Sequence, residues 1–339
     1  MVNDSVISVK NIKTYFYSEK RCNRAVNGVS FEVRRGRTLC IVGESGCGKS
    51  VTASSIMQLL PRLSRIEEGE IIYHSEDRGD IVLSDLPRNG KEMRSIRGKD
   101  IAMIFQDPMT ALNPVFKVGW QISENILFHE NVSKKEAHAR ALALMNQMGI
   151  PEPEKRINQY PHEYSGGMRQ RAMIAMAMSC NPKVLLADEP TTALDVTIQA
   201  QILDLMKSLQ EELGMAIITI THDLGVVAQM CDEVIVMYAG SICEQGTADE
   251  IFYNPCHEYT KGLLRSIPTE GNDGEKLEPI TGTPIDLLNM PKGCPFAPRC
   301  DNAMKICLRE RAERMQINDD HAAGCWMNVK KQMEGGEKA

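Results

Sequence analysis

Residues 38–60, TLCIVGESGCGKSVTASSIMQLL, decide the fold of this 339-residue chain. A short apolar run leads into a glycine-rich loop, Gly43 to Ser50, which fits the pattern G-x-x-x-x-G-K-[ST]. Such a loop turns its backbone N–H groups toward a phosphate chain. The residues that follow have helical spacing, so the expected helix directs its positive end at the same anion. The stretch therefore predicts a strand, a phosphate-binding loop (P-loop) and a helix.

Two side chains of this loop have separate expected roles. Lys49 adds a positive charge at the β- and γ-phosphates, and Ser50 offers its hydroxyl to Mg²⁺. The set that we expect to hold the nucleotide is Gly43, Ser45, Gly46, Cys47, Gly48, Lys49, Ser50 and Val51.

Apolar runs elsewhere in the chain predict the fold class. The runs in 183–190 and 215–223 read as strands that are buried on both faces, as in a parallel sheet. Helical patterns alternate with them, which is typical of an α/β fold. Residues 234–246 predict a β-hairpin with its turn at Ala239–Gly240. Residues 107–180 predict a mostly helical insertion, in which Ser133 caps a helix.

Composition limits the classes of function. Lys and Arg number 39 against 45 Asp and Glu, and this net charge of −6 does not favour a nucleic-acid-binding surface. The N-terminus lacks the pattern of a signal peptide, and the apolar runs are too short to span a bilayer. The eleven cysteines are expected to be reduced thiols.

Acidic and polar residues follow the expected strands. Asp188 ends the run VLLAD, where it can hold Mg²⁺, and Glu189 comes next, where it can polarise the attacking water. Gln106 follows another apolar run and could touch metal or water. His222 ends a third run and could position a γ-phosphate. Asp195 follows closely in TTALD, and a structural role is the alternative for His222 at its strand end.

A second anion site is predicted at YSGGMRQR, residues 164–171. Ser165, Gly166 and Gly167 open an expected helix, where a hydroxyl and two glycine amides can face an anion. Because the chain already has a P-loop, this second site makes sense for a nucleotide that another subunit holds. An ordinary helix cap is the alternative.

In their order along residues 6–255, these motifs resemble those of ATP-binding-cassette ATPases. The resemblance implies ATP and Mg²⁺ as cofactors, with Ser50, Gln106 and Asp188 at the metal. It also implies a P-loop ATPase core with a mostly parallel sheet, an antiparallel β subdomain and a helical subdomain. Two subunits would sandwich each ATP, and Phe16 would stack on adenine. Tyr164 and Met168 stand where the family usually has Leu and Gln.

Three further strings narrow the resemblance: FQDPMTALNP (105–114), CHEYTKGLL (256–264) and GCPFAPRC (293–300). They are similar to the ATPase subunits of dipeptide and oligopeptide importers, with nickel importers as close relatives. Such a subunit lies peripherally on the cytoplasmic face of the cell membrane. The implied partners are a second, paralogous ATPase subunit, two transmembrane permeases and an extracytoplasmic substrate-binding protein, with no nucleic acid.

Other functions remain open on the residues alone. The chain could energise import of nickel or another small solute. It could be a soluble cassette ATPase that acts on nucleic acid or ribosomes, although it has a single P-loop and no basic patch. A regulatory subunit without ATPase activity is disfavoured by intact Lys49, Asp188, Glu189 and His222.

The composition changes after residue 255, so we expect an ATPase domain over 1–255 and a linker with a C-terminal extension over 256–339. The linker, 267–284, is polar and rich in Gly and Pro. The extension is small and polar, and segments of that size rarely hold together by core burial alone.

The extension carries Cys294, Cys300, Cys307 and Cys325. Four thiolates could hold Zn²⁺ or an iron–sulfur cluster, although no tight pair of the kind common in zinc sites occurs. Unligated thiols are a further alternative. The importer resemblance implies a four-iron four-sulfur cluster. A metal would staple the extension apart from ATP hydrolysis, and His321 is expected beside the ligands or at the surface.

Overall fold

The computed structural model describes residues 4–18, 21–192, 194–266 and 279–329. The chain divides into two compact units, which are described separately below. Unit 1 consists of residues 1–7, 33–38 and 73–220, and unit 2 of residues 8–32, 39–72 and 221–339. Within the described ranges, no helix is long and apolar enough to cross a membrane. Most of the predicted linker, residues 267–278, lies outside these ranges.

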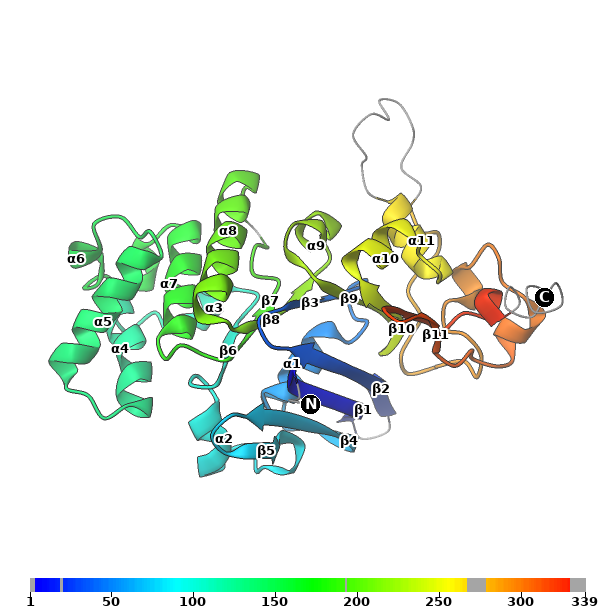
Figure 1. Ribbon diagram of the computed structural model, residues 1–339, viewed down its shortest axis with the longest axis horizontal. Coiled ribbons are helices and arrows are strands. Elements are labelled where there is room, and N and C mark those ends of the chain that lie inside the picture. The colour runs from blue at the N-terminus through cyan, green and yellow to red at the C-terminus, as the bar shows by residue number, and fades with distance from the viewer. Residues whose placement is uncertain (1–3, 19–20, 193, 267–278, 330–339) are drawn as a thin grey trace. The chain divides into compact units, whose positions relative to one another are not determined.

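Unit 1 has three parallel strands in the order β8-β7-β6, flanked by helices (Figure 1). β7 and β8 are buried along their whole length, as predicted for inner strands of a parallel sheet. The elements of unit 1 are β5 (Gly79–Val82), η1 (Leu83–Asp85), α2 (Lys91–Ile96), β6 (Ile101–Ile104), α3 (Pro108–Ala111), α4 (Val118–His129), α5 (Lys134–Gln147), α6 (Pro153–Arg156), η2 (Pro161–Glu163), α7 (Gly166–Met178), β7 (Val184–Asp188), α8 (Val196–Leu213) and β8 (Ala216–Thr221), the last residue of which belongs to unit 2.

Residues 107–180 are helical wherever they have regular structure, and they include α3 to α7. α4 packs against α5 and α7 (Figure 1). Ser133 caps α5, because its hydroxyl accepts a hydrogen bond of 3.2 Å from the Glu136 N–H. The predicted helix start at this position is therefore confirmed.

Unit 2 contains the P-loop strand and the whole C-terminal region. Its elements are β1 (Ser5–Ser18), β2 (Arg21–Arg34), β3 (Thr38–Val42), α1 (Lys49–Ile56), β4 (Ser64–Ser75), α9 (Leu224–Met230), β9 (Glu233–Tyr238), β10 (Ser241–Thr247), α10 (Ala248–Tyr253), α11 (Glu258–Arg265), η3 (Ala297–Arg299), η4 (Lys305–Leu308), β11 (Met315–Asn318) and β12 (His321–Ala323). The ends of β1, β2, β3 and β4 reach into unit 1. β2, β1 and β4 are neighbours in a separate sheet.

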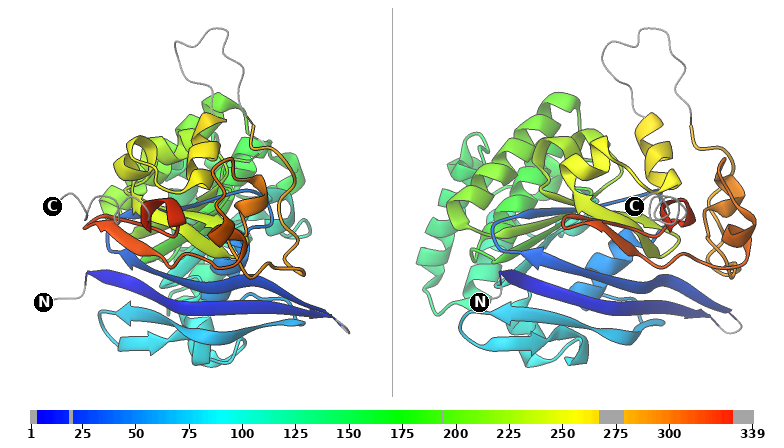
Figure 2. Two further views of the ribbon diagram at one scale, coloured as in Figure 1. Left: turned by 90° about the vertical axis from the view of Figure 1, so that its right-hand side faces the viewer. Right: turned by 45° about the vertical axis from the view of Figure 1, so that its right-hand side comes forward.

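The C-terminal extension contributes two strands to the sheet that contains the P-loop strand. β3 pairs in parallel with β9, and β9 turns through Ala239 and Gly240 into antiparallel β10. Both turn residues have positive φ, 48° and 76°, as a tight hairpin requires, so the predicted hairpin is confirmed. β12 then pairs with β10, and β11 with β12 (Figure 2). The sequence analysis did not predict these two strands.

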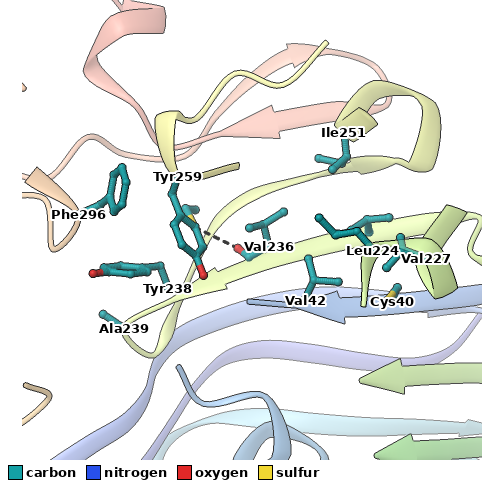
Figure 3. Close-up of a cluster of buried hydrophobic side chains, with 12 residues drawn as sticks. Cys40, Val42, Leu224, Val227, Val236, Tyr238, Ala239, Ile251, Tyr259 and Phe296 are labelled. Atoms are coloured by element: carbon teal, nitrogen blue, oxygen red, sulfur yellow. Dashed lines mark hydrogen bonds between the residues drawn. The ribbon is translucent and has the colours of Figure 1, made fainter. Parts of the chain in front are cut away.

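A hydrophobic cluster joins the extension to the inner strands of unit 2 (Figure 3). Val42 of β3 and Val236 of β9 belong to the same cluster as Tyr238, Tyr259 and Phe296. The rings of Tyr238 and Tyr259 lie 4.7 Å apart, and those of Tyr259 and Phe296 lie 5.3 Å apart. Aromatic contacts at these distances stabilise a core beyond the burial of area alone. The extension is therefore held by core packing as well as by strand pairing.

His257 begins α11 inside this packing. The His257 ring accepts a hydrogen bond of 3.1 Å at Nδ1 from the Tyr259 N–H, and the backbone N–H of His257 donates to the Glu244 carboxylate. The ring is 4% exposed, and burial lowers the pKa of His257 to about 4. The imidazole is therefore neutral at pH 7, as an accepting Nδ1 requires.

We expect His257 to destabilise unit 2 in acid. Its folded pKa is below the ordinary value, so the unfolded chain binds more protons between pH 6.5 and 4. The free energy of unfolding should fall by up to about 3 kcal/mol across this range through His257 alone. His257→Asn keeps a capping oxygen and should show a shallower fall in denaturant titrations at several pH values. Exposed His138→Asn is the control, and equal slopes in all three proteins would contradict the assignment.

Candidate functional site

The P-loop of unit 2 passes so close to other backbone that two of its glycines tolerate no side chain. A Cβ at Gly43 would lie 2.2 Å from the Met237 carbonyl oxygen, and one at Gly48 would lie 2.3 Å from that of Ala25. Both glycines also have positive φ, 148° and 105°. The Gly240 N–H donates to the Cys47 carbonyl at 2.9 Å. The loop is thus shaped by β2 and by the β9–β10 turn.

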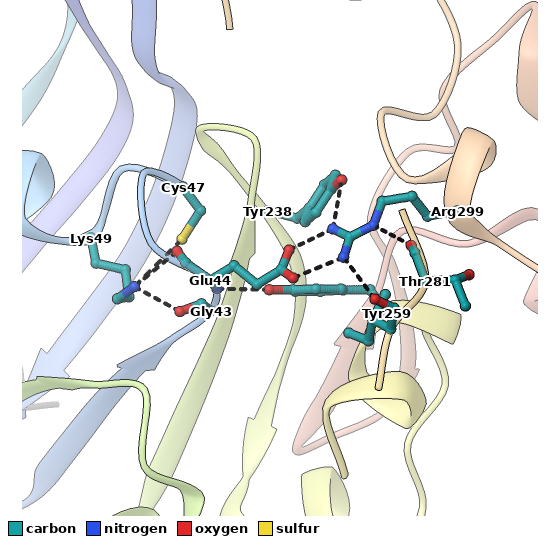
Figure 4. Close-up of polar contacts among 9 residues, drawn as sticks. Gly43, Glu44, Cys47, Lys49, Tyr238, Tyr259, Thr281 and Arg299 are labelled. Atoms are coloured by element: carbon teal, nitrogen blue, oxygen red, sulfur yellow. Dashed lines mark hydrogen bonds and ion pairs between the residues drawn. The ribbon is translucent and has the colours of Figure 1, made fainter. Parts of the chain in front are cut away.

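Lys49, at the start of α1, folds back over the loop (Figure 4). Its Nζ donates to the carbonyls of Gly43 at 2.7 Å and Glu44 at 3.0 Å. The side chain is largely buried, whereas Ser50 beside it is exposed. The ammonium is therefore held at the loop itself, where a phosphate can replace the carbonyl oxygens as its acceptor.

Phe16 lies on the face of β1 that is shared with the P-loop helix. Two residues earlier, buried Thr14 forms a hydrogen bond of 2.8 Å with Ser55 of α1. Residues i and i+2 of a strand point to the same side, so Phe16 shares this face and Tyr15 and Tyr17 point to the other. Tyr15 is bonded to Asn27, and Tyr17 to Glu67. Both tyrosines have partners on their own face, which favours Phe16 as the aromatic that would meet a base.

Asp188 and Glu189 lie at the carboxyl end of β7 in unit 1. Asp188 is buried. Glu189 has a left-handed backbone with φ of 47°, and its N–H donates to the Ile220 carbonyl at 2.8 Å. Its carboxylate accepts hydrogen bonds from Gln106 Nε2 at 2.8 Å and from the Thr192 hydroxyl at 3.0 Å. The structure therefore brings Gln106 and Glu189 together. Thr192 was not predicted from the sequence as a partner of Glu189.

The Ser-Gly-Gly sequence begins α7, also in unit 1. The Ser165 hydroxyl accepts a hydrogen bond from the Met168 N–H. A Cβ at Gly166 would meet nothing within 4 Å, whereas one at Gly167 would lie 3.1 Å from the Ile198 side chain. Asp195 caps α8 through the Ile198 N–H at 3.0 Å. Gly167 at the start of α7 therefore lies close to Ile198 in the first turn of α8.

His222 follows β8 and belongs to unit 2, with an exposed side chain. Asp223 caps α9, because its Oδ1 accepts the Gly225 N–H at 2.8 Å. Unit 2 therefore holds the P-loop, Phe16 and His222. Unit 1 holds Gln106, Asp188, Glu189, Asp195 and the Ser-Gly-Gly sequence.

The C-terminal extension reaches the P-loop directly (Figure 4). Arg299 donates to both carboxylate oxygens of Glu44, at 2.6 and 2.9 Å. The Tyr259 hydroxyl accepts a hydrogen bond of 2.8 Å from the Glu44 N–H. The sequence analysis did not predict this contact of the extension with the P-loop. Both residues lie in strings quoted above, 256–264 and 293–300, but a string does not reveal their contacts with Glu44, because these contacts depend on long-range packing.

The four cysteines of the extension are free thiols. The Cys294 N–H donates to the Cys307 carbonyl at 2.7 Å. Burial raises the pKa of the Cys300 thiol to about 11, and the nearby thiols of Cys325 and Cys294 add to that rise. No three of the four sulfurs lie within 4.8 Å of one another, although all four residues are described. One tetrahedral zinc ion would need sulfurs about 4 Å apart.

A buried acid–imidazole pair fixes the far end of the extension. His321 Nε2 lies 2.7 Å from Glu244, and its Nδ1 lies 3.2 Å from Glu250. His321 is buried, so its predicted alternative position at the surface is wrong. Cys256 Sγ lies close enough to complete a possible metal group with Glu244 and His321. The Glu244 carboxylate already accepts hydrogen bonds from the backbone N–H groups of Cys256 and His257. We therefore describe Glu244 and His321 as a hydrogen-bonded pair and not as a metal site.

Comparison with known proteins agrees with this geometry. Residues 26–192 match the family described as ABC transporter, and residues 243–307 match the family described as oligopeptide/dipeptide transporter, C-terminal region. The Bacillus subtilis dipeptide transport ATP-binding protein DppD is 53% identical over 96% of this chain and 95% of its own length. The oligopeptide transport ATP-binding protein OppD of the same organism is 53% identical over 95% of this chain and 88% of its own length.

Solved structures show the same fold. The cassette MJ0796, in a dimeric post-hydrolysis state bound to ADP and Pi, superimposes with a TM-score of 0.63 at 28% identity, over 71% of this chain and 98% of its own. The cassette cbiO1 of Clostridium perfringens, part of a transporter complex, has a TM-score of 0.60 at 27% identity, over 74% and 92%. The predicted α/β cassette fold is confirmed, and the chain belongs to the ATP-binding proteins of the ABC transporter family, in the group of dipeptide and oligopeptide transport proteins.

Proposed function

We propose that this chain hydrolyses ATP to energise the import of dipeptides or oligopeptides through partner membrane permeases. The observation that carries the proposal is the held carboxylate of Glu189 beside buried Asp188, in a chain that also has an intact P-loop. The match of residues 243–307 to a transporter C-terminal region supports a peptide cargo over nickel or another solute. The same match disfavours a cassette ATPase that acts on nucleic acid or ribosomes.

Peptide uptake tests this proposal directly. The chain should co-purify with two permeases, and ATP-dependent uptake of a labelled dipeptide or oligopeptide into vesicles should require it. Uptake of nickel but of no peptide would favour the alternative cargo. Association with ribosomes or nucleic acid in place of permeases would contradict the transport function.

Each predicted residue would have its own part in ATP hydrolysis. The P-loop amides and Lys49 would bind the phosphates, and Phe16 would stack on adenine. Ser50, Asp188 and Gln106 would contact Mg²⁺ directly or through water, so Gln106 would exchange its bond to Glu189 for the metal. Glu189 would polarise the attacking water, and His222 would position the γ-phosphate.

A second ATPase subunit, paralogous to this chain, would complete the site. The N-terminus of α7, with the Ser165 hydroxyl and the amides of Gly166 and Gly167, would form an anion site in unit 1, close to the first turn of α8 that Asp195 caps. We assign it to the nucleotide of the partner subunit. The dimeric state of the related cassette MJ0796 supports this assignment.

Exposed apolar side chains in unit 1 offer a surface for the permeases. They gather over residues 105–128 and include Met109 at 59% exposure and Trp120 at 45%. The Phe116 and Trp120 rings stack at 4.4 Å. Exposed apolar groups of this size mark interaction sites. We place the subunit on the cytoplasmic face of the membrane, with an extracytoplasmic substrate-binding protein delivering the peptide to the permeases.

We also propose that Cys294, Cys300, Cys307 and Cys325 hold a four-iron four-sulfur cluster. Their thiols are near enough to interact, yet they are spaced more widely than one zinc ion requires. In a four-iron four-sulfur cluster each thiolate binds a different iron, so the cysteine sulfurs lie farther apart than around one zinc ion. Its role would be to hold the extension together, and zinc remains the alternative outcome of the test.

Glu189→Gln should stop hydrolysis while ATP still binds. The new amide oxygen can still accept from Gln106, but it cannot take a proton, so turnover should fall about 10²–10⁴-fold. Steady-state ATPase assays with the permeases present, beside equilibrium ATP binding, measure this. Glu211→Gln, an exposed change on α8, should keep the normal rate. Normal turnover of the Glu189 variant would refute its role.

Gly166→Asp should separate binding from hydrolysis. A side chain at Gly166 meets open space in this chain, so folding and P-loop binding of ATP should survive. The carboxylate would repel the partner's γ-phosphate, and hydrolysis should fall at least about tenfold. Gly166→Ala, which adds bulk without charge, is the matched control. If the Asp variant hydrolyses ATP as fast as the Ala variant, no phosphate approaches this site.

Cys307→Ser should remove the metal cluster. Anaerobically purified wild-type protein should contain about four irons and four sulfides per chain and absorb broadly in the visible range. The variant should lose both and show faster proteolysis of the extension. Cys180→Ser in unit 1 should behave as wild type. One zinc per chain without sulfide would establish the zinc alternative, and neither metal would reject a metal site.

A further inference from the structure

The acidic side chain of the P-loop is neutralised by the C-terminal extension. Glu44 follows Gly43 directly, and its carboxylate receives two parallel hydrogen bonds from Arg299 (Figure 4). The two residues are 255 positions apart in the chain. Two-pronged guanidinium–carboxylate pairs of this kind fix orientation as well as charge. The position of Glu44 is therefore set by the extension.

Arg299 is itself fixed in place. Its side chain is 5% exposed, and its Nε donates to the Thr281 carbonyl at 2.9 Å. Its guanidinium also donates to the Tyr238 hydroxyl at 3.3 Å. The bonds to Glu44 are the main cause that raises the pKa of Arg299 above its ordinary value. Arg299 ends η3, which follows Phe296 of the hydrophobic cluster, so the core holds its backbone.

Glu44 connects Arg299 to the phosphate-binding lysine. The Glu44 carbonyl accepts a hydrogen bond from Lys49 Nζ, and the Glu44 N–H donates to Tyr259. A freed Glu44 carboxylate would be a negative group on the loop that must receive negative phosphates, and it could draw the Lys49 ammonium to itself. Pairing with Arg299 removes both effects.

We propose that Arg299 is a positioning residue for ATP binding, which keeps the Glu44 carboxylate away from Lys49 and from the incoming phosphates. The inference rests on the proposed role of the P-loop in binding ATP. The proposal makes the extension part of the nucleotide site. It also places Cys300 directly after Arg299, the residue that would influence nucleotide affinity.

Three variants of the full chain test the proposal by their Kd for Mg²⁺ with a non-hydrolysable ATP analogue, measured by calorimetry. Arg299→Ala frees the carboxylate and should weaken binding about tenfold. Glu44→Gln has no carboxylate to free and should bind within about threefold of wild type. The double variant should also bind within about threefold, because Glu44→Gln removes the group that Arg299 restrains. Arg309→Ala, an exposed change in the same extension, is the control and should match wild type.

The recovery in the double variant distinguishes positioning from a merely structural role. If Arg299 only stabilised the extension, the double variant would bind as weakly as Arg299→Ala, which would overturn the proposal. Unchanged affinity in Arg299→Ala would overturn it as well. If that variant fails to fold, Arg299→Gln with and without Glu44→Gln gives the same comparison. A wild-type chain that binds no analogue would instead contradict the proposed function of the P-loop.

Discussion

The P-loop can receive phosphate only if its backbone holds its shape before the ligand arrives, and close backbone approach provides that shape. Gly43 lies against the carbonyl of Met237 in β9, and Gly48 against that of Ala25 in β2. These approaches leave no space for a Cβ, so glycine is required for packing as well as for φ. Phosphate recognition therefore depends on the position of β9. This strand pairs with β10, which in turn pairs with β12 of the extension.

This dependence explains why the extension belongs to the sheet. β10 returns from β9, β12 pairs with β10, and the buried pair of Glu244 and His321 ties the two strands together. Burial alone would raise the pKa of Glu244, but hydrogen bonds from His321 and from the backbone N–H groups of Cys256 and His257 hold that pKa below its ordinary value. The bond to Glu244 raises the pKa of His321 in turn. The contribution of the charged His321 to the free energy of unfolding is therefore complete in mild acid, and it is lost as the pH rises through the pKa of His321 in the folded protein.

Local chemistry explains what could be predicted from sequence. The positive φ of the P-loop glycines, the hairpin at Ala239–Gly240 and the cap at Ser133 each depend on residues within a few positions, so a short string is enough to predict them. The contact of Glu44 with Arg299 and that of Glu244 with His321 join residues that are far apart in the chain. Their polar side chains have many possible partners in an unfolded chain, and only the packed strands select one. The two added strands were missed for the same reason, because β11 and β12 are four and three residues long.

Glu189 of unit 1 and Glu44 of unit 2 are restrained in opposite ways, and the difference suits the part proposed above for each. Glu189 is held by the amide of Gln106 and the hydroxyl of Thr192, which are uncharged donors that orient a carboxylate. A cation there would lower the affinity of a carboxylate for the proton of water, which a general base must accept. Glu44 has no proton to take, and its charge opposes phosphate binding. A guanidinium that is always charged suits that position, since it cancels the charge at any physiological pH and fixes both oxygens. In the proposed mechanism, the Glu189 carboxylate would therefore stay able to take a proton, whereas the Glu44 carboxylate is neutralised by Arg299.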